Sequence, residues 1–333
     1  MLDERWDADD ADLAAGLRAI LDAECTSEVV RAAERAPDGR APELEARLHD
    51  FGLDDLPLEP ATLTAAAWEL GRALAPVAFV ETAATAAVAG RRGVADGCDG
   101  LVPAMVGSAL VSDAAGAGHV VDVTAPARRT TAGDLLCEAP EPPRGDAEIP
   151  ADDVDRIRRL GALLDAARMV GASEGLLSIG VDYVGERRQF GQPVGSFQAV
   201  AHRLADTFVA VDGAGLLVRK AAWVARAEQG GDGAPDALFA SIARERAVHG
   251  ARKVATDVHQ VMGGYGFAEE YDCQLYSRRL RSWAMRRGDA GAALAEVGRS
   301  VVDPGRRGAV THLWNNDRGL ALPRWAAEMD GAP

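Results

Sequence analysis

The chain has 333 residues, 48% of them apolar, and a formal net charge of −15. This length and composition allow two or three compact units with a sizeable core. The acidic balance argues against nucleic acid and anionic membrane as partners, because both require a basic surface.

Two further features bound the class of protein. No apolar run reaches the roughly 18 residues that a membrane span needs, and the acidic N-terminus is not a secretory signal. The cysteines are widely separated and show neither metal-ligand spacing nor a redox pair, so we expect free thiols in a reducing cytoplasm and no metal site. These cysteines are Cys25, Cys98, Cys137 and Cys273.

The first hundred residues carry helical patterns. Apolar side chains recur at helical spacing in four segments, at about 11–25, 41–51, 60–74 and 76–89. We therefore predict an N-terminal helical domain over residues 1–99.

Between residues 100 and 150 the pattern changes to short apolar runs that Gly, Pro, Asp and Thr interrupt. Such runs are typical of short strands and loops. Pro140, Pro142, Pro143 and Pro150 stand among acidic residues, a composition that is typical of a linker. We predict that this segment is a reduced β middle domain followed by a linker.

The rest of the chain predicts a helical bundle. Its helical periods run at about 153–187, 196–228, 234–262, 272–286 and 289–302. They indicate a C-terminal four-helix bundle over residues 151–303, followed by a tail over residues 304–333 with a short helix around Trp325. The predicted fold class is therefore mainly α.

The turn between the first two of these helices holds the most informative polar residues. Pro193 stops the first helix from running through, and Ser196 is a favourable N-cap for the second. Arg187, Arg188 and Gln198 therefore converge where one helix ends and the next exposes its N-terminal N–H groups. Such a corner favours an anion, especially a phosphate. The alternative is that the two arginines only compensate the dipole of their own helix.

The segment Arg187-Arg-Gln-Phe-Gly-Gln-Pro-Val-Gly-Ser-Phe-Gln198, followed by Leu204-Ala-Asp206, resembles the C-terminal domain of the acyl-CoA dehydrogenases. A second segment, Gln260-Val-Met-Gly-Gly-Tyr-Gly-Phe267, resembles the family's Gln-x-x-Gly-Gly-x-Gly motif. The two segments have the order and separation of the family. Residues 68–81 are similar, more loosely, to the family's N-terminal helical domain.

The resemblance implies that FAD lies across a subunit interface and that this chain contacts its pyrophosphate and adenosine. Arg187 would pair with a pyrophosphate oxygen, and Gln198 would hydrogen-bond the dinucleotide. Gln260, Gly263 and Gly264 would bring the backbone close to the phosphates, where a Cβ would obstruct. Without the first motif, Gly263 and Gly264 would be interpreted as a helix C-cap.

The resemblance also locates the family's catalytic glutamate, which removes the α-proton of the acyl thioester. Its two positions in the family correspond to Arg287 and Gly161 in this chain, and neither residue can be the base. The loop that holds the flavin ring and the Trp beside the ring are also missing, since no Trp occurs between Trp68 and Trp223. We therefore assign no catalytic residue.

These losses fall on the half of the site that holds the reacting ring, whereas the residues that reach a neighbour's site are kept. The pattern resembles the short subunits of heterotetrameric acyl-CoA dehydrogenases in bacterial breakdown of steroid side chains. The implied function is to complete the FAD site of a catalytic partner subunit. That partner would dehydrogenate an acyl-CoA and pass electrons to an electron-transfer flavoprotein or a similar acceptor.

Two alternatives stay open at this point. One is a homomeric dehydrogenase with a relocated base, for which Asp289 is the candidate, although Asp289 also suits the N-cap of the last helix. The other is a flavin-free scaffold or binding protein on the same fold.

Overall fold

The computed structural model describes residues 6–96, 101–103, 108–112, 117–122, 128–130, 135–138, 147–226, 234–235, 237–287 and 290–302. Three predictions fall outside these residues: most of the linker, the tail with Trp325, and the candidate base Asp289.

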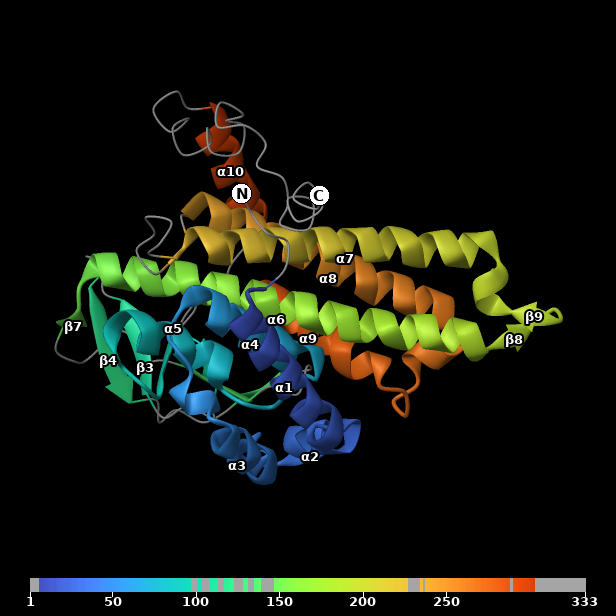
Figure 1. Ribbon diagram of the computed structural model, residues 1–333, viewed down its shortest axis with the longest axis horizontal. Helices are drawn as coiled ribbons and strands as arrows, with labels where there is room; N and C mark the ends of the chain where they lie inside the picture. The colour runs from blue at the N-terminus through green and yellow to red at the C-terminus, as the bar shows by residue number, and fades with distance from the viewer. Residues whose placement is uncertain are drawn as a thin grey trace, which may run out of the picture.

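Short helices make up the N-terminal part of the chain (Figure 1). They are α1 (Ala8–Glu24), α2 (Ser27–Arg35), α3 (Pro42–Phe51), α4 (Pro60–Arg72) and α5 (Phe79–Ala89), with a 3-10 turn at Leu53–Asp55. The sequence patterns predicted four of these helices but missed α2, which has 9 residues and a Thr26 side chain that caps its Val29 N–H.

The described strands between residues 94 and 149 are short and form two small sheets. The first has the order β1-β3-β4-β7, in which β1 pairs with β3 in parallel and the other pairs are antiparallel, and the second has the order β2-β6-β5. The strands are β1 (Val94–Asp96), β2 (Leu101–Pro103), β3 (Ser108–Ser112), β4 (Gly118–Asp122), β5 (Arg128–Arg129), β6 (Leu135–Glu138) and β7 (Ala147–Ile149).

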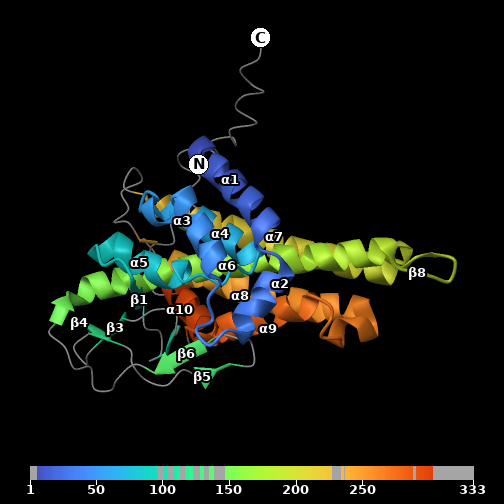
Figure 2. The same ribbon diagram turned by 90° about the horizontal axis from the view of Figure 1, so that it is seen from below.

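A long helix, α6 (Ala151–Glu186), runs the length of the molecule, and the other long helices lie along it (Figures 1 and 2). The strands lie near its N-terminal end, and a small hairpin of β8 (Arg188–Gln189) and β9 (Gln192–Pro193) extends from its C-terminal end. The other helices of the bundle are α7 (Gln198–Val224), α8 (Ala237–Met262), α9 (Cys273–Met285) and α10 (Ala290–Val302). The mainly helical fold class predicted from the sequence is confirmed.

The start of α7 differs from the prediction. Ser196 is not its N-cap, because Val194–Ser196 form a 3-10 turn and α7 begins at Gln198 with Phe197 as the cap residue.

The described part of the chain contains no helix that is both long enough and apolar enough to cross a membrane.

Glycines let α4 and α6 approach until their backbones touch. A Cβ on Gly171 would lie 2.0 Å from the Trp68 carbonyl oxygen, and one on Gly71 would lie 2.1 Å from the Arg168 carbonyl oxygen.

One continuous cluster of buried apolar side chains extends from α1 through α9, so the N-terminal helices and the bundle share a core. The division into domains at residues 99, 150 and 303 therefore stays a prediction.

We predict that Gly171→Ala lowers the free energy of unfolding by about 1–3 kcal/mol, because its methyl group must displace backbone and not a flexible side chain. Gly213→Ala on α7 is the matched control, since a Cβ there meets nothing within 4 Å. It should raise the free energy of unfolding by up to about 1 kcal/mol through helix propensity. Chemical denaturation of both variants tests this, and equal effects would contradict the close approach.

Candidate functional site

The predicted contact residues gather at one end of the bundle, beside the β8–β9 hairpin. Arg187 caps the C-terminus of α6, and Gln198 is the first residue of α7. Asp257 of α8 accepts hydrogen bonds from Arg203 and Thr207 of α7, each at 2.7 Å, so these antiparallel helices are in register here. Gln198 and Gln260 therefore lie toward the same end. We call this end, with Arg187, Gln198, Gln260, Gly263 and Gly264, the anion corner.

The two sequence motifs meet at the anion corner through aromatic rings. The Arg187 guanidinium carbon lies 5.4 Å from the centroid of the Tyr265 ring, which belongs to a 3-10 turn that follows α8 at Gly263–Phe267. The Tyr265 ring lies 6.0 Å from that of Tyr183 and 5.3 Å from that of Tyr271. The structure thus brings Arg187 beside the glycine turn, although about 75 residues separate them in the sequence.

The two glycines of the turn have different physical explanations. Gly263 has φ +60°, the left-handed conformation that commonly ends a helix, so the C-cap interpretation accounts for it. Gly264 has no positive φ, and a Cβ added there or at Gly263 would meet nothing within 4 Å. The backbone at Gly264 is therefore open to a close-approaching ligand, as the resemblance implies.

The first turn of α7 supplies the electrostatic attraction for an anion. Phe197 has no polar side chain to cap this helix, so the first N–H groups of α7 have no side-chain partner from the cap residue. Free N–H groups at a helix N-terminus attract negative charge. Arg188 is used within its own hairpin, where its Nη2 donates to the Gly191 carbonyl oxygen at 3.1 Å. Arg187 and the α7 N-terminus therefore remain as the candidate groups for an anion at this corner.

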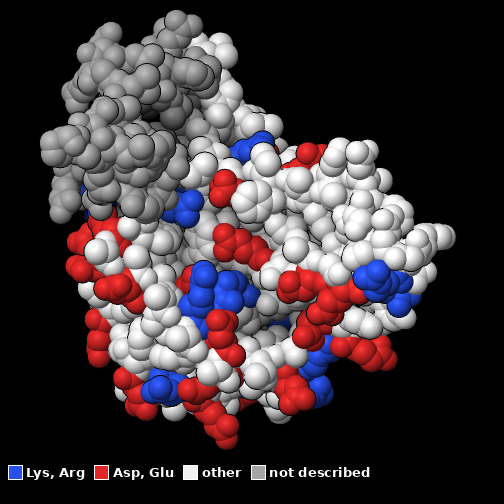
Figure 3. Space-filling view, turned by 45° about the vertical axis from the view of Figure 1, so that its right-hand side comes forward, with Lys and Arg blue, Asp and Glu red and all other residues white. Residues whose placement is uncertain are grey.

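Large apolar side chains are exposed around the anion corner. The exposed fractions are 92% for Phe190 at the hairpin tip, 79% for Phe267 in the glycine turn, and 58% for Phe208 on α7. Figure 3, which brings this end of the molecule forward, shows a wide surface without charged side chains next to clustered basic and acidic groups. Exposed phenylalanine rings beside an uncharged surface are typical of a protein interface.

The two positions of the missing base converge elsewhere, near the N-terminal half of α6. A Cβ on Gly161 would lie 2.6 Å from Nη2 of Arg287, which follows α9. Arg287 Nη1 donates to Asp96 Oδ2 at 2.8 Å, and its Nε donates to Asp165. Only the resemblance linked Arg287 and Gly161 in the sequence. The structure places the Arg287 guanidinium within contact distance of Gly161. A guanidinium fills the space that a side chain at position 161 would need.

Arg287 belongs to a buried network of charges. Arg168 Nη1 and Arg286 Nη1 donate to Glu81 Oε1 at 2.6 and 2.7 Å, and Arg168 also bridges to Asp165. The Arg168 guanidinium lies 4.3 Å from the Trp283 ring centroid. Among the described residues, three guanidinium groups thus face three carboxylates, with side-chain exposures between 4% and 16%. The charge network consists of Glu81, Asp96, Asp165, Arg168, Arg286 and Arg287.

The charge network lowers the pKa of two of its carboxylates, Asp165 and Glu81. Burial by itself would raise the pKa of Asp165, but Arg168 and Arg287 outweigh burial and hold that pKa well below its ordinary value of 3.8. The pKa of Glu81 is likewise lowered from 4.5, because Arg168 and Arg286 outweigh burial. A general base works best with a pKa near the operating pH, so these paired carboxylates are poor bases.

The network was not found from the sequence. Its acidic members come from α5, β1 and α6, which are far apart along the chain, and single Asp and Glu residues in helical patterns carry no local signal. An expectation could have come only from Arg287 itself, since a buried guanidinium requires carboxylates around it.

The chain was compared with known proteins. Residues 159–302 match the family described as acyl-CoA dehydrogenase, C-terminal domain, which includes the five predicted contact residues as well as Gly161 and Arg287. This part of the chain is therefore similar to the C-terminal domain of the acyl-CoA dehydrogenases. Acyl-CoA dehydrogenase FadE34 of Mycobacterium tuberculosis is 35% identical over 143 residues, which are 43% of this chain and 20% of that protein. The chain spans between 20% and 36% of the length of the first curated relatives it matches.

Two solved structures share nearly the whole fold. The ChsE4-ChsE5 complex from Mycobacterium tuberculosis has a TM-score of 0.77 and 24% identity, over 91% of this chain and 99% of that chain. A Tcur3481-Tcur3483 steroid acyl-CoA dehydrogenase variant has a TM-score of 0.76 and 23% identity, over 87% of this chain and 96% of that chain. The resemblance stated from the sequence is confirmed for the C-terminal domain over residues 159–302 and for the fold.

The charge network predicts a loss of stability in acid. Because the folded-state pKa values of Glu81 and Asp165 lie below 4.5 and 3.8, their contribution is present above those values and is lost as the pH falls below them. Asp165→Asn should lower the free energy of unfolding at neutral pH by about 3–5 kcal/mol and flatten its decrease between about pH 5 and pH 3.

Asp155→Asn is the control, because Asp155 pairs with Arg159 on the exposed side of the same helix. Its effect should stay within about 1 kcal/mol. Denaturant titrations across this pH range provide the measurement, and an unchanged acid slope in Asp165→Asn would contradict the assigned role of the network.

Proposed function

We propose that this chain is the non-catalytic subunit of an FAD-dependent acyl-CoA dehydrogenase and that its anion corner completes the flavin site of a catalytic partner subunit. The observation that carries this proposal is the filled base position: Arg287, held by Asp96 and Asp165, stands against Gly161. A guanidinium stays protonated in proteins and cannot accept the α-proton of an acyl thioester.

The residues of the anion corner fit a pyrophosphate. Arg187 offers a charged donor, the first turn of α7 offers backbone N–H groups, and Gly264 leaves room for close approach of the backbone. FAD, when bound, supplies the acceptor for the hydride that leaves the acyl β-carbon. The residues of this chain would contribute binding and orientation of the dinucleotide, and the base would come from the partner.

The position of the corner on α6 supports a flavin shared between subunits. From Gly161 to Glu186 the helix rises about 37 Å, at 1.5 Å per residue. A dinucleotide that reached from the anion corner to the base position of the same chain would have to span that length, and extended FAD is shorter. A pyrophosphate at the corner therefore belongs with a flavin ring held by a neighbouring subunit.

Three other features support the finer parts of the proposal. The exposed apolar side chains beside the corner, Phe190, Phe208 and Phe267, suit contact with a partner subunit in a hetero-oligomer. The two fold neighbours are named as two-component assemblies, one of them as a steroid acyl-CoA dehydrogenase, which favours a steroid-derived acyl-CoA as substrate. The buried free thiols of Cys25 and Cys273 suit a reducing cytoplasm. An electron-transfer flavoprotein or a similar acceptor would reoxidise the flavin.

We predict that Arg187→Ala weakens flavin retention by the complex about 10- to 100-fold without unfolding the bundle. The lost interaction is a charge-assisted hydrogen bond, which contributes roughly 1.5–3 kcal/mol. Arg188→Ala is the matched control, since Arg188 contacts its own hairpin. Flavin release during dilution, followed by fluorescence, provides the measurement. Equal retention by both variants would remove the phosphate role from Arg187.

Turnover distinguishes this proposal from the homomeric alternative. Asp289→Asn should leave dehydrogenation of an acyl-CoA nearly unchanged, whereas replacing the partner's glutamate should reduce it about 10²- to 10⁴-fold. Steady-state assays of the two variant complexes with an artificial electron acceptor give the comparison. Loss of activity in Asp289→Asn, with flavin content and assembly intact, would move the base into this chain.

A further inference from the structure

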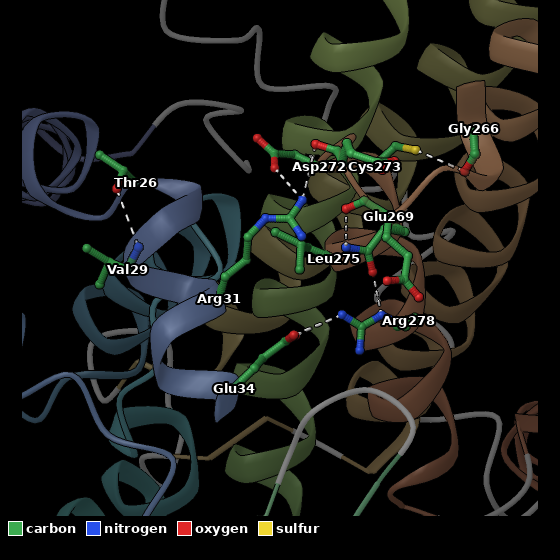
Figure 4. A network of polar contacts seen from close by, with 12 residues as sticks. Thr26, Val29, Arg31, Glu34, Gly266, Glu269, Asp272, Cys273, Leu275 and Arg278 are labelled. Atoms are coloured by element: carbon green, nitrogen blue, oxygen red, sulfur yellow. Dashed lines mark hydrogen bonds and ion pairs between the residues drawn. The ribbon is translucent and has the colours of Figure 1, made fainter. Parts of the chain in front are cut away.

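Helix α2 contacts the segment that follows the glycine turn, far along the chain. Arg31 Nη2 donates to Asp272 Oδ1 at 3.0 Å and to the Glu270 carbonyl oxygen at 3.4 Å. Figure 4 shows the Arg31 side chain extending from α2 across to Asp272 at the start of α9. Arg31 therefore donates hydrogen bonds to both the backbone and a side chain of the same short segment.

The same segment is attached to the glycine turn from the other side. Cys273 Sγ donates to the Gly266 carbonyl oxygen at 3.3 Å (Figure 4). The rings of Tyr271 and Tyr265 are 5.3 Å apart. Gly266 lies against α8, where an added Cβ would be 3.1 Å from the Cα of His259. The turn is thus held between α8 and residues 271–273, and Arg31 holds residues 270–272.

Val30 and Ala33 bury α2 in the apolar core, but the packing beside them is incomplete. A cavity of about 270 Å³ lies where α1, α2, α4, α6 and α9 meet, and its lining includes Val30, Asp272, Leu275 and Tyr276. Polar contacts also bridge α2 to α9: besides Arg31, Glu34 accepts hydrogen bonds from Arg278 at 3.0 Å and from Arg279 at 2.7 Å. The contact between α2 and α9 therefore combines buried apolar side chains with ion pairs.

We propose that Arg31 is a positioning residue for the anion corner. It acts through Asp272 and Glu270 on the glycine turn, and through Tyr265 on Arg187. The family match covers residues 159–302 only, so this role belongs to a part of the chain that the match does not reach. The statement about the glycine turn stands on the contacts alone, and its effect on flavin rests on the proposed function.

The test compares Arg31→Gln with Glu34→Gln in the full chain. Both substitutions remove ion pairs between α2 and α9, but only Arg31 contacts residues 270–272 among the described contacts of these two side chains. We expect hydrogen exchange of the amides in residues 264–272 to become about 3- to 10-fold faster in Arg31→Gln and to change little in Glu34→Gln. Arg31→Lys, which keeps the ion pair with Asp272, should restore most of the protection.

The second readout is FAD retention by the complex with the partner subunit, which should weaken in Arg31→Gln and recover in Arg31→Lys. Unchanged exchange over residues 264–272 in Arg31→Gln would overturn the positioning role, and so would equal acceleration in Glu34→Gln. Faster exchange with unchanged FAD retention would leave the contact with the turn intact and contradict the flavin role of the corner. The two failures are therefore distinguishable.

Discussion

A guanidinium that is taken out of water must be surrounded by carboxylates, and in this chain Arg287 meets that requirement through Asp96 and Asp165. The contact joins β1, α6 and the segment after α9, three parts of the chain that no sequence pattern connects. Arg168 and Arg286 add Glu81 of α5 to the same network. Gly161 is part of this constraint, because any side chain there would collide with the Arg287 guanidinium. Charge balance and the missing Cβ together fill the position that the resemblance assigns to the family's glutamate.

The opposite end of α6 is open to a ligand, whereas the end near Arg287 is filled. At the anion corner, the cap residue of α7 makes no side-chain hydrogen bond to the first N–H groups of the helix. No atom lies close to the positions where Gly263 and Gly264 would carry a Cβ, and phenylalanine rings are exposed nearby. One long helix therefore separates a site that is filled by its own charges from a site that is open to an external group. This asymmetry is the physical basis for the proposed hetero-oligomer, because a self-sufficient dehydrogenase needs both sites.

The sequence was sufficient for the parts that depend on local patterns. The long helices, the turn with Pro193, and the pairing of Arg187 with the Gly263–Phe267 segment followed from periodicity and from two motifs. It was insufficient where a feature depends on contacts between distant segments. Helix α2 is too short for a clear period, the cap of α7 moved from Ser196 to Phe197, and the charge network has no motif. Gly161 and Arg287 were connected in the sequence only through the resemblance, and the structure adds that the Arg287 guanidinium lies against Gly161.

The central claim is that this chain serves a flavin which it does not hold by itself, and flavin content tests it most directly. The measurement is the flavin absorbance per chain of homogeneous protein, purified once alone and once after co-expression with its catalytic partner. The account predicts little flavin in the protein purified alone and about one flavin per pair of unlike subunits in the complex. One flavin per chain in the protein purified alone would contradict it.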